Sequence, residues 1–218
     1  MIRKLKVMIT LMFMLGMAVA PVAAQDLDVE DMEDMGLQGM YGRMYLTEAA
    51  LTGQPGVMGV MIVGVSFTEA DVAEEAFETI TCAFAGGMLD IEDEGDCEAL
   101  QEGGVEVTDL DGVGDQAIEL IGQSGEDEDA QPILIVSTQS ANNIFLVIYL
   151  GDNEPGLADD FAVFLADADP VDTEVEFDAD NNGTGGFFDM LPQEGDAVLE
   201  GLIPYQDLDL FSEMSDGL

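Results

Sequence analysis

Apolar residues along this chain occur in short blocks, each with the period of a strand or a helix. The block Val57–Phe67 is rich in β-branched residues and follows Pro55-Gly56, which is typical of a buried strand. Thr68 then begins a helix, because its hydroxyl can accept the amide hydrogen of Asp71. The apolar residues on one face of this helix, flanked by Ala73 and Phe77, are Val72, Ala76, Ile80, Ala83 and Phe84. We expect the helix to pack on the sheet and to end at Gly86-Gly87.

Further apolar blocks predict the rest of the sheet. The expected strands span residues 104–109, 115–121, 133–138 and 144–150, with turns at 110–114, 126–129 and 139–143 and a short helical turn at 97–101. A last helix opens at Glu154-Pro155, since proline is tolerated in a first turn, and Leu157, Phe161, Phe164, Leu165 and Ala168 share one of its faces. Consecutive strands with short links predict an α+β fold: an antiparallel sheet with helices on one or both faces.

The segments on either side of these blocks lack such periods. Residues 25–40 are acidic and Met-rich, and we expect them to form a disordered lead-in. Residues 41–170 form one α+β domain, which is long enough to build its own core. Residues 171–218 are predicted to be an acidic, Gly-rich C-terminal tail.

The first 24 residues have the order of a secretory signal peptide. A basic start with Arg3, Lys4 and Lys6 precedes the apolar run 7–20, and small residues then lead to an expected cleavage after Ala24. The alternative is an uncleaved anchor, but about 14 apolar residues are fewer than the roughly 20 that a membrane span needs. We therefore expect a secreted or periplasmic protein.

The only two cysteines, Cys82 and Cys97, are predicted to form a disulfide after export to an oxidising space. Closing a loop of this length stabilises a protein by roughly 3 kcal/mol in the chain-entropy model. The alternative is a pair of buried free thiols.

The composition excludes many functions. The chain has 47 acidic residues, four basic residues and no histidine, for a formal net charge of −43. After cleavage at Ala24, Arg43 would be the only basic residue and the net charge would be −46. A surface that binds nucleic acid or an anionic membrane needs clustered Lys and Arg, so these partners are not expected. The absence of histidine excludes nucleophiles activated by histidine and metal sites with imidazole ligands. Cations or a cationic partner suit such a surface.

One local pattern indicates a metal site. Oxygen donors recur at the spacing of a calcium loop, with Gly183 at its sharp turn: Asp178, Asp180, Asn182, Thr184 and Asp189. Asp189 stands where the template has a longer glutamate, and no strong helix precedes the loop. The alternative is a flexible acidic turn, which arises easily in so acidic a chain.

Three features in order resemble a known family. These are a strand leading into the Phe67-Thr-Glu-Ala-Asp71 helix, the turn Gly112-Val-Gly-Asp-Gln-Ala117, and two apolar strands followed by a terminal helix. Together they resemble the small extracytoplasmic domains of bacterial secreted proteins and lipoproteins with a PsbP/Mog-type fold. The resemblance implies an α/β/α sandwich with a binding, sensory or accessory role, and it transfers no functional residues.

These observations favour a secreted, non-enzymatic binding or accessory domain whose ligand the sequence does not name. The alternative function is a Ca²⁺-dependent structural or adhesion module that uses residues 178–189. A carboxylate-based hydrolase is disfavoured, because the chain has no Trp and only four Tyr to form a sugar platform. We expect no catalytic residues and no cofactor other than Ca²⁺.

The charge leads to a first prediction. Repulsion among the acidic side chains opposes folding, and salt screens it over a Debye length of roughly 10 Å at 0.1 M. The midpoint of thermal unfolding is therefore expected to rise from low to near-molar NaCl. A flat response in a calorimetric salt series would contradict this.

Overall fold

The computed structural model describes residues 36–51, 57–89, 91, 97–124, 131–151, 156–168 and 187–209. Its elements, in chain order, are β1 (Leu37–Thr47), α3 (Glu48–Leu51), β2 (Val57–Phe67), α4 (Ala70–Leu89), α5 (Cys97–Glu102), β3 (Glu106–Asp109), β4 (Gln116–Ser124), β5 (Gln131–Ser140), β6 (Asn143–Gly151), α6 (Leu157–Ala166), α7 (Phe187–Met190), the 3₁₀ turn η3 (Ala197–Leu199) and β7 (Leu202–Asp209).

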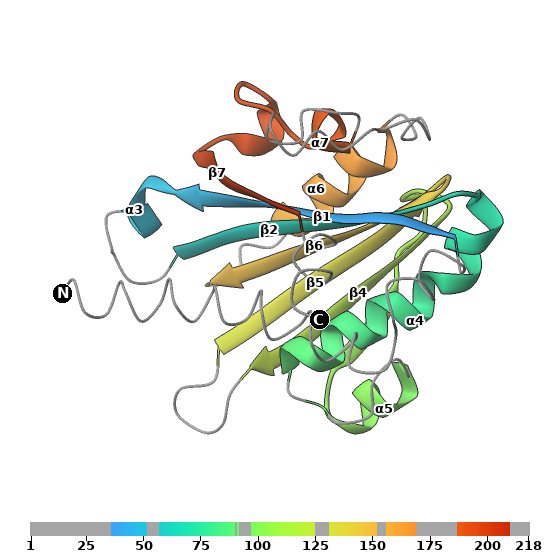
Figure 1. The fold of residues 1–218 in the computed structure, drawn as a ribbon. Helices are drawn as coiled ribbons and strands as arrows, with labels where there is room; N and C mark the ends of the chain where they lie inside the picture. The colour runs from blue at the N-terminus through green and yellow to red at the C-terminus, as the bar shows by residue number, and fades with distance from the viewer. Residues whose placement is uncertain are drawn as a thin grey trace, which may run out of the picture.

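The strands form one seven-stranded antiparallel sheet in the order β3-β4-β5-β6-β2-β1-β7 (Figure 1). The predicted α+β class with an antiparallel sheet is confirmed. Strands β4, β5 and β6 form consecutive hairpins, whereas β2 pairs with β6, more than 70 residues later in the chain. The centre of the sheet therefore depends on a long-range pairing.

Both faces of the sheet are covered. Side chains along β6 alternate between two apolar clusters: Ile144, Leu146 and Ile148 join the α4 side, and Phe145, Val147 and Tyr149 join the α6 side. On the first side α4 contributes Phe77 and Phe84, and on the second α6 contributes Phe161 and Leu165. The result is a helix–sheet–helix arrangement, with α4 and α6 on opposite faces (Figure 1).

The buried face of α4 differs from the expected one. The flanking residues Ala73 and Phe77 are fully packed, whereas Val72, Ala76 and Ile80 lie at the margin of the cluster. The helix is turned in this way because Phe77 reaches the sheet and the Thr81 hydroxyl bonds to that of Ser137 at 2.7 Å. It also continues through Gly86-Gly87 to Leu89.

The predicted loop 139–143 is a two-residue hairpin. Only Ala141 and Asn142 lie outside the strands, because Ser140 and Asn143 pair as the last rung of the ladder. Asn142 fastens the turn to the end of β2 by donating its side-chain amide to the Phe67 carbonyl at 2.7 Å. Strands β5 and β6 are thus longer than the apolar blocks 133–138 and 144–150 that predicted them.

Two edge segments correct the predicted domain limits. Strand β1 begins at Leu37, so residues 37–40 belong to the sheet and not to a lead-in. Within the expected tail 171–218, residues 187–209 contain α7, η3 and β7, and β7 pairs with β1. Glycines and Arg43 interrupt the apolar pattern of β1, while β7 is a half-exposed edge strand that contains Pro204, so neither has a strong strand signal.

Arg43 fastens this C-terminal segment to the sheet. Its guanidinium binds both carboxylate oxygens of Asp207 on β7, with Nη2 to Oδ2 at 2.9 Å, and stacks over the Phe188 ring at 5.3 Å. The hydrogen bond to Asp207 raises the pKa of Arg43. Nearby, the Tyr45 hydroxyl donates to the Pro192 carbonyl at 3.2 Å, and burial raises the pKa of this phenol.

The predicted disulfide between Cys82 and Cys97 is confirmed, with the two Cα atoms 5.3 Å apart. It joins α4 to the start of α5, and the two cysteines are 15 positions apart in the sequence. A disulfide of this kind is compatible with an oxidising compartment.

The ion pair of Arg43 leads to a second prediction. Asp207→Asn would leave the guanidinium, whose side chain is only 10% exposed, without its counter-charge. Urea unfolding should show a loss of about 1–2 kcal/mol, at the lower end of values for partly buried charge pairs because the Asp207 side chain is 40% exposed.

The matched control is Glu200→Gln, which removes one exposed negative charge from the same segment. This control should change stability little or raise it. If both variants unfolded at the same urea concentration, Arg43 would not anchor the segment.

Candidate binding cleft

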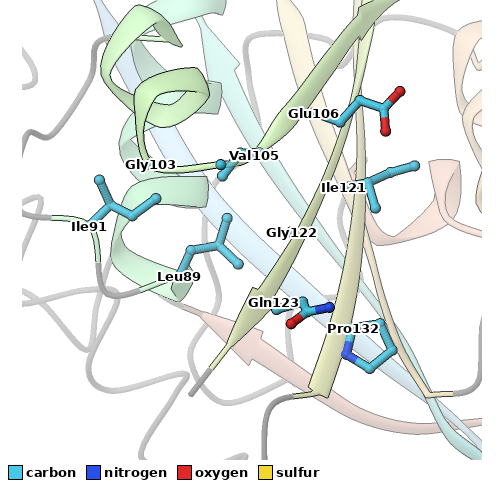
Figure 2. Close-up of a pocket in the computed structure, with 10 residues that line it drawn as sticks. Leu89, Ile91, Gly103, Val105, Glu106, Ile121, Gly122, Gln123 and Pro132 are labelled. Carbon is cyan, nitrogen blue, oxygen red and sulfur yellow. The ribbon is translucent and has the colours of Figure 1, made fainter. Parts of the chain in front are cut away.

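A cleft of about 430 Å³ lies at the edge of the sheet, where α4 ends and the β4–β5 hairpin begins (Figure 2). It is lined by Leu89, Ile91, Gly103, Gly104, Val105, Glu106, Ile121, Gly122, Gln123 and Pro132. Figure 2 shows Leu89 and Ile91 on one side and Gln123 and Pro132 near the ends of neighbouring strands. The volume falls within the range of small-molecule sites.

One wall of the cleft results from the way α5 ends. The amide of Val105 donates to the Leu100 carbonyl and that of Gly104 to the Gln101 carbonyl, both at 3.0 Å, which is a Schellman motif. Gly104 has φ +92° at the position of this motif that requires a left-handed backbone. The chain therefore turns sharply from α5 into β3, and a Cβ at Gly104 would meet no atom of the described residues within 4 Å.

The floor depends on a close approach between α4 and β4. Leu89, the last residue of α4, lies so near to Gly122 that a Cβ there would be 2.8 Å from the Leu89 Cδ1 atom. The amide of Ile91 donates to the Gly86 carbonyl at 3.0 Å, which turns the chain away after the helix. Leu89 and Ile91 are thereby presented to the cleft at the end of α4.

The lining is mixed: half of its ten residues are apolar, and glycine backbone and two polar side chains make up the rest. Five side chains are apolar: Leu89, Ile91, Val105, Ile121 and Pro132. Gln123 supplies an amide, and Glu106 is the only ionisable residue among the ten that line the cleft. One exposed carboxylate with no basic or nucleophilic neighbour in the lining can hold a ligand group, but it offers no acid–base pair for catalysis.

Acidic side chains gather on the face of β3 and β4 that α6 covers. Burial, followed by repulsion from Asp159 and Glu106, raises the pKa of Glu119 on the neighbouring face of β4. The α4 helix also ends at the cleft with no basic residue in its last turn, so the negative end of its dipole is uncompensated by its own side chains.

The predicted calcium loop lies almost entirely outside the described residues. Asp178, Asp180, Asn182 and Thr184 lie outside the described residues, and Asp189 is in α7 with a side chain that is not described. Elsewhere in the described ranges, no group of three or more Cys, Asp or Glu is placed to hold a metal ion. The calcium site stays a prediction.

Sequence reasoning did not find the cleft. Its residues belong to the ends of several elements and carry no recognisable catalytic or ligating pattern. The available signals were the pair Gly103-Gly104 after a short helix and Gly122 within an otherwise apolar strand, since glycine in a strand often marks a close approach.

Comparison of the chain with protein-family models, curated proteins and solved structures found no match. In the part of the chain that the structure describes, no helix is long and apolar enough to cross a membrane. The assignment of function therefore depends on the site itself.

The raised pKa of Glu119 leads to a third prediction. A carboxyl group whose pKa is higher in the folded than in the unfolded protein destabilises the fold once pH exceeds its unfolded value. Glu119→Gln should therefore raise the free energy of unfolding at pH 7 by about 0.5 kcal/mol, as for other screened charges near a surface.

The gain should shrink as pH falls through about 4.3, the usual pKa of a glutamate in an unfolded chain, and disappear well below it, where the carboxyl is protonated in both states. Glu75→Gln, on an exposed turn of α4, is the matched control. An equal gain from both variants in urea titrations would attribute the effect to total charge and not to the position of Glu119.

Proposed function

We propose that this protein is a secreted, non-enzymatic binding module that holds a small apolar ligand in the cleft between α4, β3 and β4. The observation that carries the proposal is the cleft lining, in which five apolar side chains stand beside three glycines, one amide and one carboxylate. Binding sites for small molecules have this composition, because apolar contacts supply the affinity and a few polar groups fix the orientation.

Export is supported by two independent features. The order of basic, apolar and small residues in positions 1–24 is that of a signal peptide. The disulfide between Cys82 and Cys97 is stable in the oxidising compartments to which such signals lead.

An accessory role is supported by the layer order. Helices on both faces of an antiparallel sheet are what the resemblance to PsbP/Mog-type domains implies. We propose that the chain shares this sandwich and, with it, the binding or sensory role of such domains. The cleft then lies on an edge of the sandwich and leaves both main faces intact.

The fourth prediction tests whether the cleft binds a ligand. Gln123 is exposed on β4 and lines the cleft, so the indole of Gln123→Trp would fill part of the space while remaining compatible with a strand. Titration with the neutral fluorophore Nile red should give saturable binding to the wild type, weakened at least about fivefold in this variant, an amount within reach of a few lost apolar contacts.

The control is Thr108→Trp, which places the same side chain at an exposed strand position that does not line the cleft. It should bind Nile red as the wild type does, and thermal unfolding of both variants establishes that they are folded. Equal binding by Gln123→Trp and Thr108→Trp, or no saturable binding to the wild type, would overturn the proposal.

A further inference from the structure

The residues that line the cleft fall into two groups with different support. Five lie on strands and are held by the sheet ladder: Glu106, Ile121, Gly122, Gln123 and Pro132. The other five lie where α4 and α5 end, and we call them the helix-end wall: Leu89, Ile91, Gly103, Gly104 and Val105. None of the helix-end wall takes part in a strand pairing of the described sheet, so its position depends on the two helices.

The disulfide joins the two segments that carry this wall. Cys82 is in the second half of α4, and Cys97 is the first residue of α5. Leu89 and Ile91 therefore lie within the segment that the disulfide closes, while residues 103–105 follow directly after the helix that it holds. Figure 2 shows the two parts of the wall beside each other, with Leu89 and Ile91 below Gly103 and Val105.

Apart from the disulfide, little holds α5 in place. The helix has six residues, far fewer than an isolated helix needs to be stable, and only Cys97 and Leu100 in it are buried. The Leu100 side chain lies against α4, since a Cβ added at Gly86 would be 3.6 Å from its Cδ2 atom. Leu100 is thus the only buried side chain of α5 besides the disulfide cysteine itself.

The last turn of α4 is also weak. Gly86 and Gly87 lie between Cys82 and Leu89, and glycine is unfavourable within a helix because it loses the most backbone freedom on folding. Leu100 packs over Gly86, so α5 supports this turn from the outside. Breaking the link between α4 and α5 would therefore loosen both parts of the helix-end wall.

We infer that the cleft is complete only when Cys82 and Cys97 are joined, so that ligand binding is confined to oxidising compartments. This inference rests on the proposed function and adds the regulation of the same site. The two cysteine thiols pass two electrons and two protons to a disulfide oxidant, which becomes two thiols, and a dithiol reductant reverses the exchange. The reduced chain, as it is synthesised, binds no ligand, and export to an oxidising space completes the cleft.

The fifth prediction compares the oxidised protein with two forms that lack the disulfide: the wild type reduced by dithiothreitol and the double variant Cys82→Ala/Cys97→Ala. Alanine is chosen because serine would place a hydroxyl group at the fully buried position of Cys82. Both forms should bind Nile red at least about tenfold more weakly than the oxidised protein, because half of the lining loses its fixed position and has to be ordered on binding.

A second measurement needs no ligand. In the helix-end wall the amides of Ile91, Gly104 and Val105 each donate to a backbone carbonyl at 3.0 Å. Loss of the disulfide should speed hydrogen exchange at these three amides at least about tenfold, because the turns that protect them open more often. Amides of β2 and β6, in the interior of the sheet, should keep their protection.

Asp207→Asn is the matched control for a general loss of stability. It weakens the fold at β7 and changes none of the lining residues. This variant should bind Nile red as the wild type does, and exchange at the helix-end wall should not change.

The outcomes separate the inference from the proposed function. Weaker binding together with faster exchange confined to the helix-end wall supports the inference. Unchanged affinity or unchanged exchange without the disulfide overturns it and leaves the proposed function standing. Faster exchange throughout β2 and β6 overturns it too, because the disulfide would then support the whole core. If the oxidised protein does not bind Nile red, the proposed function itself fails, and the exchange rates alone decide whether the disulfide orders the wall.

Discussion

The two central strands, β2 and β6, carry apolar side chains on both faces, so a separate element has to cover each face of the sheet. Helix α4 covers one face and α6 the other, and Phe77 and Phe161 anchor the two helices. Helix α4 ends at Leu89, but the sheet continues beyond this residue, and the cleft lies where the helix no longer covers the sheet. The position of the candidate site is thus a consequence of how the core is closed.

The excess of acidic side chains limits how the margins of this fold can be fastened. Arg43 is the only basic residue in the described part of the chain, so the other acidic side chains there have no basic side chain to pair with. The Arg43–Asp207 pair holds the segment 187–209 against β1. The pair works because it is backed by the Phe188 ring and shielded from water on the arginine side. Elsewhere, apolar packing, the sheet ladder and the disulfide provide the cohesion, and none of these requires opposite charges.

The sequence predicts elements well where local pattern and final environment agree. The strand Val57–Phe67, the disulfide and the order of the strands from β3 to β6 follow from apolar blocks, turn residues and the cysteine count. Prediction from the sequence fails where the structure of a segment depends on the strand or helix that it pairs with. Strand β7 is a strand because β1 offers it an edge and Arg43 holds Asp207, and neither fact is visible in residues 202–209 alone. The turned face of α4 has the same cause, since the position of Ser137 on β5 helps to determine which side of the helix is buried.

The cleft is the part of the protein that the local sequence pattern predicts least well, because glycines, which have no side chain, shape it as much as the apolar residues do. Gly104 gives the left-handed residue that turns the chain into β3, and Gly122 lets Leu89 approach β4. The composition nevertheless constrained the answer from the beginning. Among the described residues only Arg43 carries a positive charge, and Asp207 binds it, so an anionic group in the cleft would meet no counter-charge from a described side chain.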